Sequence, residues 1–234
     1  MDESAAPKTN RLLAALPNAV YRRLLPNLEA TMLRDGEALL APDGSMKYAY
    51  FPTSSIVSLY YDDAKDTVAN AWPVGREGML GISLFLGMPK FIKRADVHIG
   101  GPAFRLPAAA MLAEFRRAGA LQKLLLRYLS ALITQASQLG MCGNYHPIGQ
   151  RLCRFLLVAF DGIDGNEIVL TQERIASLLG VRRASVTQAA TQLQADELIE
   201  YVRGRVRLIN RQKLETRSCV CTGVIRRAFA AVSG

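Results

Sequence analysis

The chain has 234 residues, of which 50% are hydrophobic and 21% charged, so it can bury one or two cores and is not of the disordered or collagen-like class. Its 29 Lys and Arg residues exceed its 20 Asp and Glu residues, which gives a net charge of +9 and an isoelectric point near 9.7. This balance favours a polyanionic partner, either nucleic acid or an anionic membrane surface.

Signals for secretion or membrane insertion are missing from the sequence. Residues 1–4 are acidic and no apolar stretch follows them, so we expect no signal peptide. The longest uncharged run, between Arg127 and Arg151, holds too many polar residues for a transmembrane helix. Four cysteines in a chain of this length are not a disulfide framework. We therefore expect a reduced, cytoplasmic protein that makes no membrane contact.

The character of the chain changes near residue 107. Before it, turn residues separate short runs rich in β-branched and aromatic side chains, such as residues 48–51, 56–61 and 97–99. Many short strands at this spacing predict a sandwich, jelly roll or barrel. Two short helical segments, residues 11–16 and 20–28, precede the predicted strands.

Residues 108–142 are predicted to form one long helix. Within it, mostly apolar residues follow one another at alternating steps of four and three over three heptads, which favours pairing with a second copy of the same helix. The alternative is a single amphipathic helix packed on the β-rich part. The residues assigned to the dimer seam are Leu121, Leu125, Tyr128, Leu132 and Leu139.

The segment after residue 147 has the pattern of a helix-turn-helix. A helix over residues 148–160 and a loop over 161–166 lead to Thr171, a good N-cap, and Gly180 is a typical left-handed helix stop. A second helix is expected over about residues 183–195. Two short helices joined by a glycine-containing turn are the helix-turn-helix plan.

The second of these helices carries side chains suited to base edges. Its predicted exposed face holds Arg183, Thr187, Gln188 and Thr191, with Arg182 and Ser185 at its start. The alternative is an ordinary polar surface. Alternation around Arg203-Gly204 then predicts a β-hairpin wing whose arginines, Arg203, Arg205 and Arg207, could hold phosphate.

The order of β-rich part, long helix and winged helix-turn-helix resembles the Crp–Fnr family of transcription regulators over about residues 30–215. The resemblance implies an α+β fold with an N-terminal cyclic-nucleotide-binding-like β-roll (jelly roll), a long dimerisation helix and a C-terminal winged helix-turn-helix. The corresponding domains are residues 1–107, 108–143 and 144–234. It also implies a homodimer that binds near-palindromic double-stranded DNA and has RNA polymerase as a partner.

The resemblance assigns roles to individual positions. Residues matching Arg183, Ala184 and Gln188 face base edges in the family, and those matching Thr171, Gln172 and Ser185 help to hold phosphate. This chain has Ala184 where the best-known members carry Glu, and Gln188 where they carry Arg. Its DNA site should therefore differ from theirs.

The effector side departs further from the family. Members that bind cyclic AMP have Gly-Glu-Leu for the ribose and an Arg-Ser pair for the phosphate. Here the matching candidates are Met79, Leu80, Arg94 and Ala95, so the ribose carboxylate and the phosphate-binding hydroxyl are missing. We expect a degenerate effector pocket, with an effector that the sequence does not identify.

Cys219-Val220-Cys221 leaves two interpretations open. Together with Cys142, Cys153, His98 or His146 the pair could bind a metal or form a redox switch, whereas Cys142 and Cys153 at apolar helical positions are typical of inert buried thiols. No Cys-x2-Cys spacing supports a zinc site, so we expect no metal and no cofactor.

Catalytic machinery is not recognisable in the sequence. No nucleophile–base–acid set is present, so we do not expect an enzyme. A competing function is a ligand-binding regulatory module that acts on a partner protein rather than on DNA.

Overall fold

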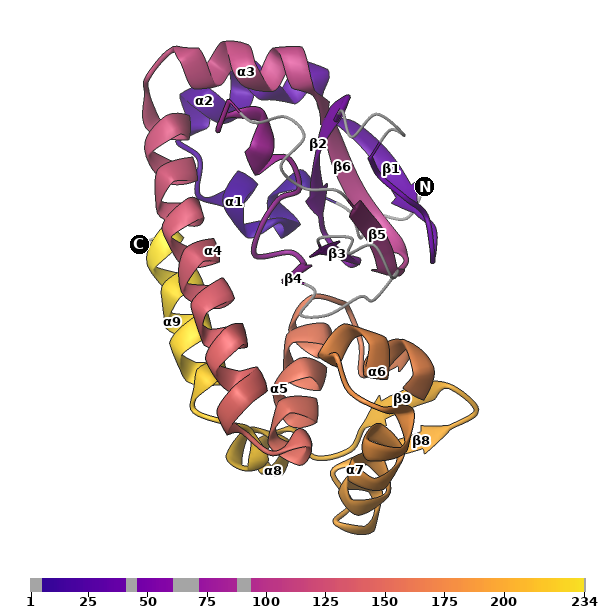
Figure 1. Cartoon of the computed structure of the whole chain (residues 1–234). Coiled ribbons are helices and arrows are strands. Elements are labelled where there is room, and N and C mark those ends of the chain that lie inside the picture. Colours follow the sequence, from indigo (N-terminus) through magenta and orange to yellow (C-terminus); the bar gives the residue numbers. More distant parts are fainter. Residues whose placement is uncertain (1–5, 41–45, 61–71, 88–93, 234) are drawn as a thin grey trace.

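The computed structural model describes residues 6–40, 46–60, 72–87 and 94–233, and Figure 1 shows them as an N-terminal β domain, a long helical side and a C-terminal domain below it. Residue 61 of the strand predicted over 56–61 lies outside the described residues. So does the side chain of Arg94.

Short helices open the chain, as the sequence predicts. They are η1 (Pro7–Thr9), α1 (Arg11–Ala14), α2 (Asn18–Leu24) and η2 (Leu25–Asn27). The Asn10 side chain caps α1 by accepting from the backbone N–H groups of Leu12 and Leu13, and its amide donates to the carbonyls of Pro52 and Gly78. One buried Asn thus ties the first helix to the β domain.

Two three-stranded antiparallel sheets form the β domain. The first has the order β1 (Glu29–Leu33), β6 (Gly101–Pro107), β2 (Tyr48–Pro52), and the second β4 (Trp72–Val74), β3 (Ile56–Tyr60), β5 (Arg94–Ile99). A 3-10 turn, η3 (Ile82–Leu84), precedes β5. Leu33, Val57, Leu80 and Val97 pack in one core of this domain. These short paired strands confirm the predicted β-rich architecture.

The single long helix predicted over residues 108–142 is in fact two helices. Helix α3 (Ala108–Arg116) ends at a turn in which Ala118 has φ +54°, and α4 (Ala120–Tyr145) begins after Gly119. A positive φ interrupts a right-handed helix, so α3 ends before Ala118 and a new helix begins after it. Helix α4 also extends three residues beyond the predicted end.

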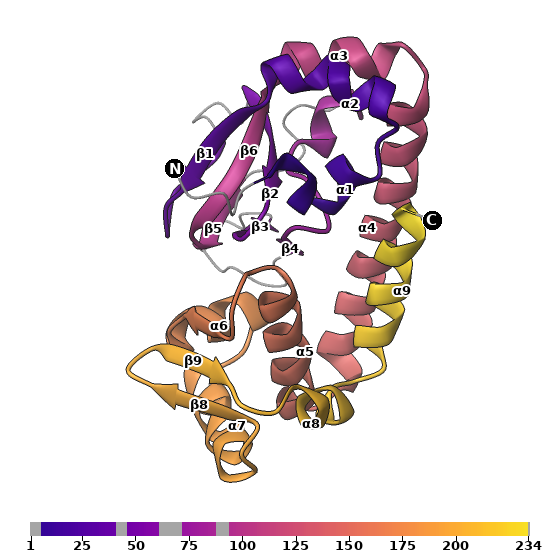
Figure 2. The ribbon, with the colours of Figure 1, turned by 180° about the vertical axis from the view of Figure 1, so that it is seen from behind.

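The last helix, α9 (Cys221–Ser233), lies along α4 in both views of the molecule (Figures 1 and 2). Val232 of α9 is buried in the core that holds Leu121, Leu125 and Tyr128 of α4. The C-terminus thus returns from the C-terminal domain to the side of the β domain, which the sequence did not predict.

The C-terminal domain has the predicted winged helix-turn-helix order. It comprises α5 (Ile148–Asp161), β7 (Glu167–Val169), α6 (Gln172–Leu179), α7 (Arg183–Ala195), β8 (Ile199–Val202), β9 (Arg205–Leu208) and α8 (Arg211–Arg217). Strand order is β7-β9-β8, all antiparallel. Among the described residues, no helix has the length and apolar character needed to cross a membrane.

Candidate nucleic-acid interface

Local sequence signals fix the two helices of the helix-turn-helix. The Thr171 hydroxyl accepts from the backbone N–H of Arg174 at 3.3 Å, which caps α6, and Gly180 ends α6 with φ +62°. Ala176 is buried in the same core as Val186 and Ala190 of α7. Small side chains at this crossing let the two helices approach closely, which sets the angle at which α7 projects from the domain.

The outer face of helix α7 carries only neutral and basic side chains. Arg182, Arg183, Ala184, Thr187, Gln188 and Thr191 are exposed and Ser185 is half-buried, whereas Val186, Ala189, Ala190 and Leu193 are buried. Helix α7 contains no acidic residue. The positive N-terminal end of the helix dipole adds to the charge of the two arginines at the same end.

Contacts between α6 and α7 hold the start of the outer face. The Thr187 hydroxyl donates to Gln172 Oε1 at 2.6 Å, and Arg183 Nε lies 3.8 Å from a carboxylate oxygen of Glu173. Both groups of the ion pair are mostly exposed, so the pair orients Arg183 more than it stabilises the fold. The structure thus brings together Arg183 and Thr187, which the sequence placed on one helical face, and Gln172, to which the family resemblance gave a phosphate contact.

The wing is tied to the start of α6. Its turn has φ +49° at Arg203 and +79° at Gly204, which is typical of a two-residue hairpin loop. The Leu170 N–H donates to the Gly204 carbonyl at 2.7 Å, and the Tyr201 hydroxyl donates to the Leu170 carbonyl at 2.6 Å. Burial raises the pKa of Tyr201 to about 12, so this hydroxyl keeps its proton at neutral pH.

The three wing arginines differ in their partners. Arg205 pairs with Glu167 of β7 at 2.7 Å and Arg207 with Glu200 of β8, so carboxylates of the same sheet partly neutralise both. Arg203, at the exposed tip, makes no ion pair with another described residue. Arg203 is therefore the wing cation best placed to meet an external anion.

A surface hollow of about 420 Å³ lies between the start of α7, the start of α6 and the wing. It is lined by Thr171, Gln172, Glu173, Arg183, Tyr201, Arg203 and Gly204. Two guanidinium groups and three neutral hydrogen-bonding side chains meet there with one carboxylate that Arg183 already pairs. A phosphate of a nucleic-acid backbone suits this composition.

The five residues assigned to a dimer seam are buried within a single chain, whereas a seam for a second copy would be exposed in one chain. Leu121, Leu125, Tyr128, Leu132 and Leu139 are all less than 7% exposed within a single chain, and all but Leu139 belong to the core shared with α1, α2 and α9. The heptad pattern of α4 thus reflects its packing on the β domain and on α9. This agrees with the alternative interpretation, in which the helix is amphipathic and packs on the β-rich part.

A second stripe on α4 remains exposed. Leu126, Ile133 and Met141 are 57%, 59% and 45% exposed, and the small residues Ser130, Ser137 and Gly140 lie between them. The steps from 126 through 130, 133 and 137 to 140 are four, three, four and three, so they face one side of the helix. This stripe was missed because the stronger leucine pattern masked it.

The residues assigned to the effector pocket form part of the cores. Met79, Leu80 and Ala95 are each at most 1% exposed. The Tyr128 hydroxyl of α4 donates to the Met79 carbonyl at 3.0 Å. The same hydroxyl accepts a hydrogen bond from the Met79 backbone N–H at 3.1 Å. The side chains of Met79, Leu80 and Ala95 thus face packed protein rather than solvent.

The structure separates the residues considered as metal ligands. Cys142, Cys219 and Cys221 form one buried cluster with His146 beside it, whereas Cys153 packs in the helix-turn-helix core. His98 Nδ1 accepts from the Arg174 guanidinium at 2.9 Å, across the contact between β5 and α6.

Comparison with known proteins agrees with this arrangement. Residues 150–217 match the model of the Crp-like helix-turn-helix domain. No curated protein is significantly similar in sequence to the chain.

Solved structures share the fold at low sequence identity. A regulator from Eubacterium rectale assigned to the Crp/Fnr family has 18% identity and a TM-score of 0.61, with 90% of this chain and 98% of that chain covered. TTHA1359 from Thermus thermophilus, a regulator of the same family, has 17% identity and a TM-score of 0.58, covering 81% and 98%. FixK2 from Bradyrhizobium japonicum has 14% identity and a TM-score of 0.60, covering 82% and 98%.

Proposed function

We propose that this chain is a transcription regulator like those of the Crp/Fnr family and that it acts as a homodimer that binds a specific DNA sequence. The match to the Crp-like helix-turn-helix model and the shared fold support this proposal. The β-roll within residues 1–107 would be the regulatory domain and α4 the dimerisation helix. The domain of residues 144–234 would bind the DNA through its winged helix-turn-helix.

The outer face of α7 is the observation that carries this proposal. It is exposed, lacks acidic residues, and has arginines at the N-terminal end that enters the major groove in helix-turn-helix proteins. Arg183 can bind guanine O6 and N7 through two hydrogen bonds, and Gln188 can bind adenine N6 and N7. The contacts to phosphate would come from six further residues, namely Thr171, Gln172, Arg182, Ser185, Arg203 and Arg205.

Homodimerisation follows from the exposed stripe of α4. A helix that keeps Leu126 and Ile133 in water beside small residues at heptad spacing gains hydrophobic stabilisation when a second copy covers them. A twofold dimer presents two α7 helices, so the site should be near-palindromic with half-sites about one helical turn apart.

Selection of bound sequences from a random DNA pool tests the proposal. We expect a near-palindromic consensus whose affinity falls steeply as salt concentration rises. If no sequence is enriched and salt-sensitive DNA binding is absent, the chain instead regulates a partner protein through its β-roll, and the DNA-binding function is wrong.

A further inference from the structure

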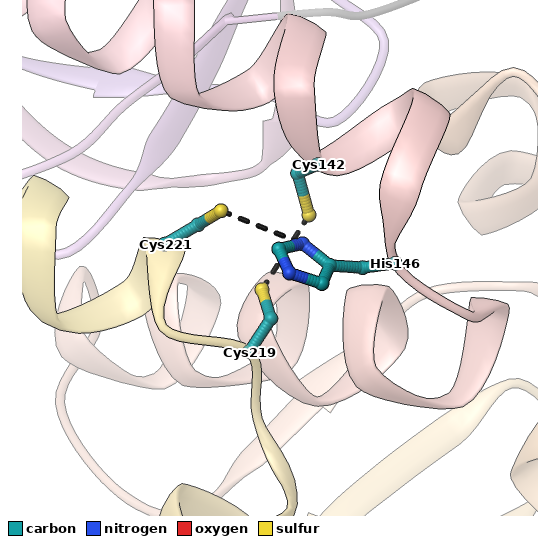
Figure 3. A group of neighbouring side chains, drawn as sticks. All are labelled: Cys142, His146, Cys219 and Cys221. Carbon is teal, nitrogen blue, oxygen red and sulfur yellow. Dashed lines mark hydrogen bonds between the residues drawn. The ribbon is translucent and has the colours of Figure 1, made fainter.

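We infer that Cys142, His146, Cys219 and Cys221 form a structural zinc site, which goes beyond the DNA-binding function. Their four ligand atoms, three Sγ and one imidazole nitrogen, all lie within 4.8 Å of one another. Figure 3 shows the three thiols and the imidazole pointing toward a common centre from the end of α4 and the start of α9.

Two of the distances between ligand atoms are close to those around a single tetrahedral ion. Cys142 Sγ lies 3.5 Å from Cys219 Sγ, and Cys221 Sγ lies 3.5 Å from His146 Nδ1. Bonds from zinc of about 2.3 Å to sulfur and about 2.0 Å to nitrogen place sulfurs about 3.8 Å apart, and sulfur and nitrogen about 3.5 Å apart. An iron–sulfur cluster holds its ligands on different iron atoms and would spread them more widely.

Local structure brings the ligands together in two pairs. Cys142 and His146 are four residues apart at the end of α4, so they lie on one helical face. Cys219 lies between α8 and α9, and Cys221 is the first residue of α9. Val220 between them is 72% exposed, which leaves both thiols turned inward.

The charge around the cluster fits a bound zinc ion. Three thiolates, a neutral imidazole and Zn²⁺ carry a net charge of −1. Arg154 is 5% exposed, its Nε atom has no hydrogen-bond partner, and it makes no ion pair with a described carboxylate. Its guanidinium lies beside the Cys142 thiol, and the Arg151 guanidinium donates to the carbonyl of Gly143, the residue after Cys142. A buried arginine beside three thiols is explained if the cluster is anionic.

Four protein ligands close the coordination shell, so the site would be structural rather than catalytic. The ion would join the end of α4 to the start of α9, at the two points where the chain enters and leaves the helix-turn-helix domain. It would thereby fix the position of that domain relative to α4.

Metal analysis of the purified chain tests this inference independently of DNA binding. The full-length protein, purified under reducing conditions and incubated with zinc before desalting, should hold about one zinc per chain. Cobalt added in place of zinc should give the ligand-field and thiolate charge-transfer absorption of a tetrahedral thiolate site. Chelation should lower the midpoint of thermal unfolding.

Variants separate this site from a simple cysteine cluster. Cys142→Ser, Cys221→Ser and His146→Asn should each lose most of the bound metal, whereas Cys153→Ala, which removes the one cysteine outside the cluster, should keep about one zinc per chain. Arg154→Met, which alters only the surroundings, should weaken zinc binding by about 10–100-fold.

Three results would overturn the inference. The first is a zinc-incubated wild-type chain that holds no more metal than Cys142→Ser. The second is a Cys142–Cys219 disulfide in protein isolated under reducing conditions, which would show a redox pair instead. The third is iron with acid-labile sulfide in anaerobically purified protein, which would show a cluster rather than a single ion.

Discussion

At the scale of single residues, the proposed function assigns base recognition and phosphate contact to different arginines. Arg183 is paired with Glu173 at the start of α7, from which it would reach base edges, whereas Arg203 stands at the wing tip. Replacing either arginine removes one positive charge. The two losses should nevertheless have different consequences for sequence preference.

Arg183→Ala should cost about 1–3 kcal/mol of binding free energy on the selected site and relax the preference at one base pair in each half-site. Arg203→Ala should weaken binding to all sequences alike and lower the salt slope by about one. Titrations of specific and scrambled DNA over a range of salt measure both effects. Arg116→Ala, an exposed cation on α3, is the control. If Arg183→Ala left affinity and preference unchanged, α7 would not be the reading helix.

A second residue, Tyr128, connects α4 to the β domain. Its hydroxyl both donates to and accepts from the backbone of Met79, and burial raises its pKa, so it keeps its proton. Gly78 is required beside it, because a Cβ there would overlap the Tyr128 ring. No pattern in the sequence marks this contact, because Tyr128 also fits a leucine-type seam.

Tyr128→Phe should lower the free energy of unfolding by about 1–3 kcal/mol, because it leaves a buried N–H and carbonyl without a partner. Denaturant unfolding measures this loss. Tyr145→Phe, at a tyrosine that is 78% exposed, should change stability little. Equal stability of Tyr128→Phe and the wild type would mean that water or a small shift satisfies the Met79 backbone.

At the scale of elements, sequence patterns located the helix-turn-helix better than the long helix. Capping and stop residues act locally, so Thr171, Gly180 and the Arg203-Gly204 turn could be predicted without knowledge of the fold. The face of α4 that carries the leucines is set by what packs on it. Its partners, α1 and α9, are about 100 residues away in either direction, and their positions could not be derived from periodicity.

Leu126→Asp combined with Ile133→Asp should turn a dimer into folded monomers with weak DNA binding, because a charge on the exposed stripe opposes its burial against a second chain. Sedimentation and circular dichroism measure assembly and folding. Met32→Asp, an equally exposed apolar residue on β1, should leave the dimer intact.

Aspartate substitutions in the leucine pattern distinguish the buried face of α4 from its exposed stripe. Leu125→Asp with Leu132→Asp buries two carboxylates in the core and should unfold the domain instead of producing folded monomers. The opposite result would be folded monomers from this pair and an intact dimer in the Leu126 and Ile133 variant. It would show that the dimer interface is the leucine seam.

At the scale of the whole molecule, polar contacts join the C-terminal domain to the β domain. Arg174 of α6 donates to the Val97 carbonyl at 2.7 Å as well as to His98, and Arg76 pairs with Asp164 at 2.7 Å. The Asp164 N–H also donates to the Ser54 hydroxyl at 2.8 Å. Such long-range pairs depend on the assembled fold and were not predicted from the sequence.

Two routes of contact thus connect the β domain to the helix-turn-helix domain. One passes through the β5 and α6 contact. The other passes through α4, which Tyr128 attaches to the β domain and which ends at the candidate zinc site. The first route starts at β5, which carries Ala95, and the second at Met79, and both residues were assigned to the pocket of the expected effector.

Cyclic AMP should not be that effector. The β-roll can persist after its ligand chemistry is lost, because function resides in the site rather than in the fold. Met79 stands where the ribose carboxylate is expected and Ala95 where the phosphate-binding hydroxyl is expected, and both are buried in packed cores. Each missing hydrogen bond to a charged or desolvated group costs about 1–3 kcal/mol, so two would weaken binding by about 10²-fold or more.

Isothermal titration of the full chain with cyclic AMP and cyclic GMP should therefore show no binding at micromolar concentration, and neither nucleotide should change DNA affinity. A Met79→Glu, Ala95→Ser double variant would restore the two missing groups, but Met79 lies under Tyr128, so we expect this variant to lose stability rather than to gain cyclic AMP binding. Micromolar binding to the wild-type chain that is coupled to tighter DNA binding would show that backbone amides near Gly78 and Gly81 hold the phosphate without those side chains.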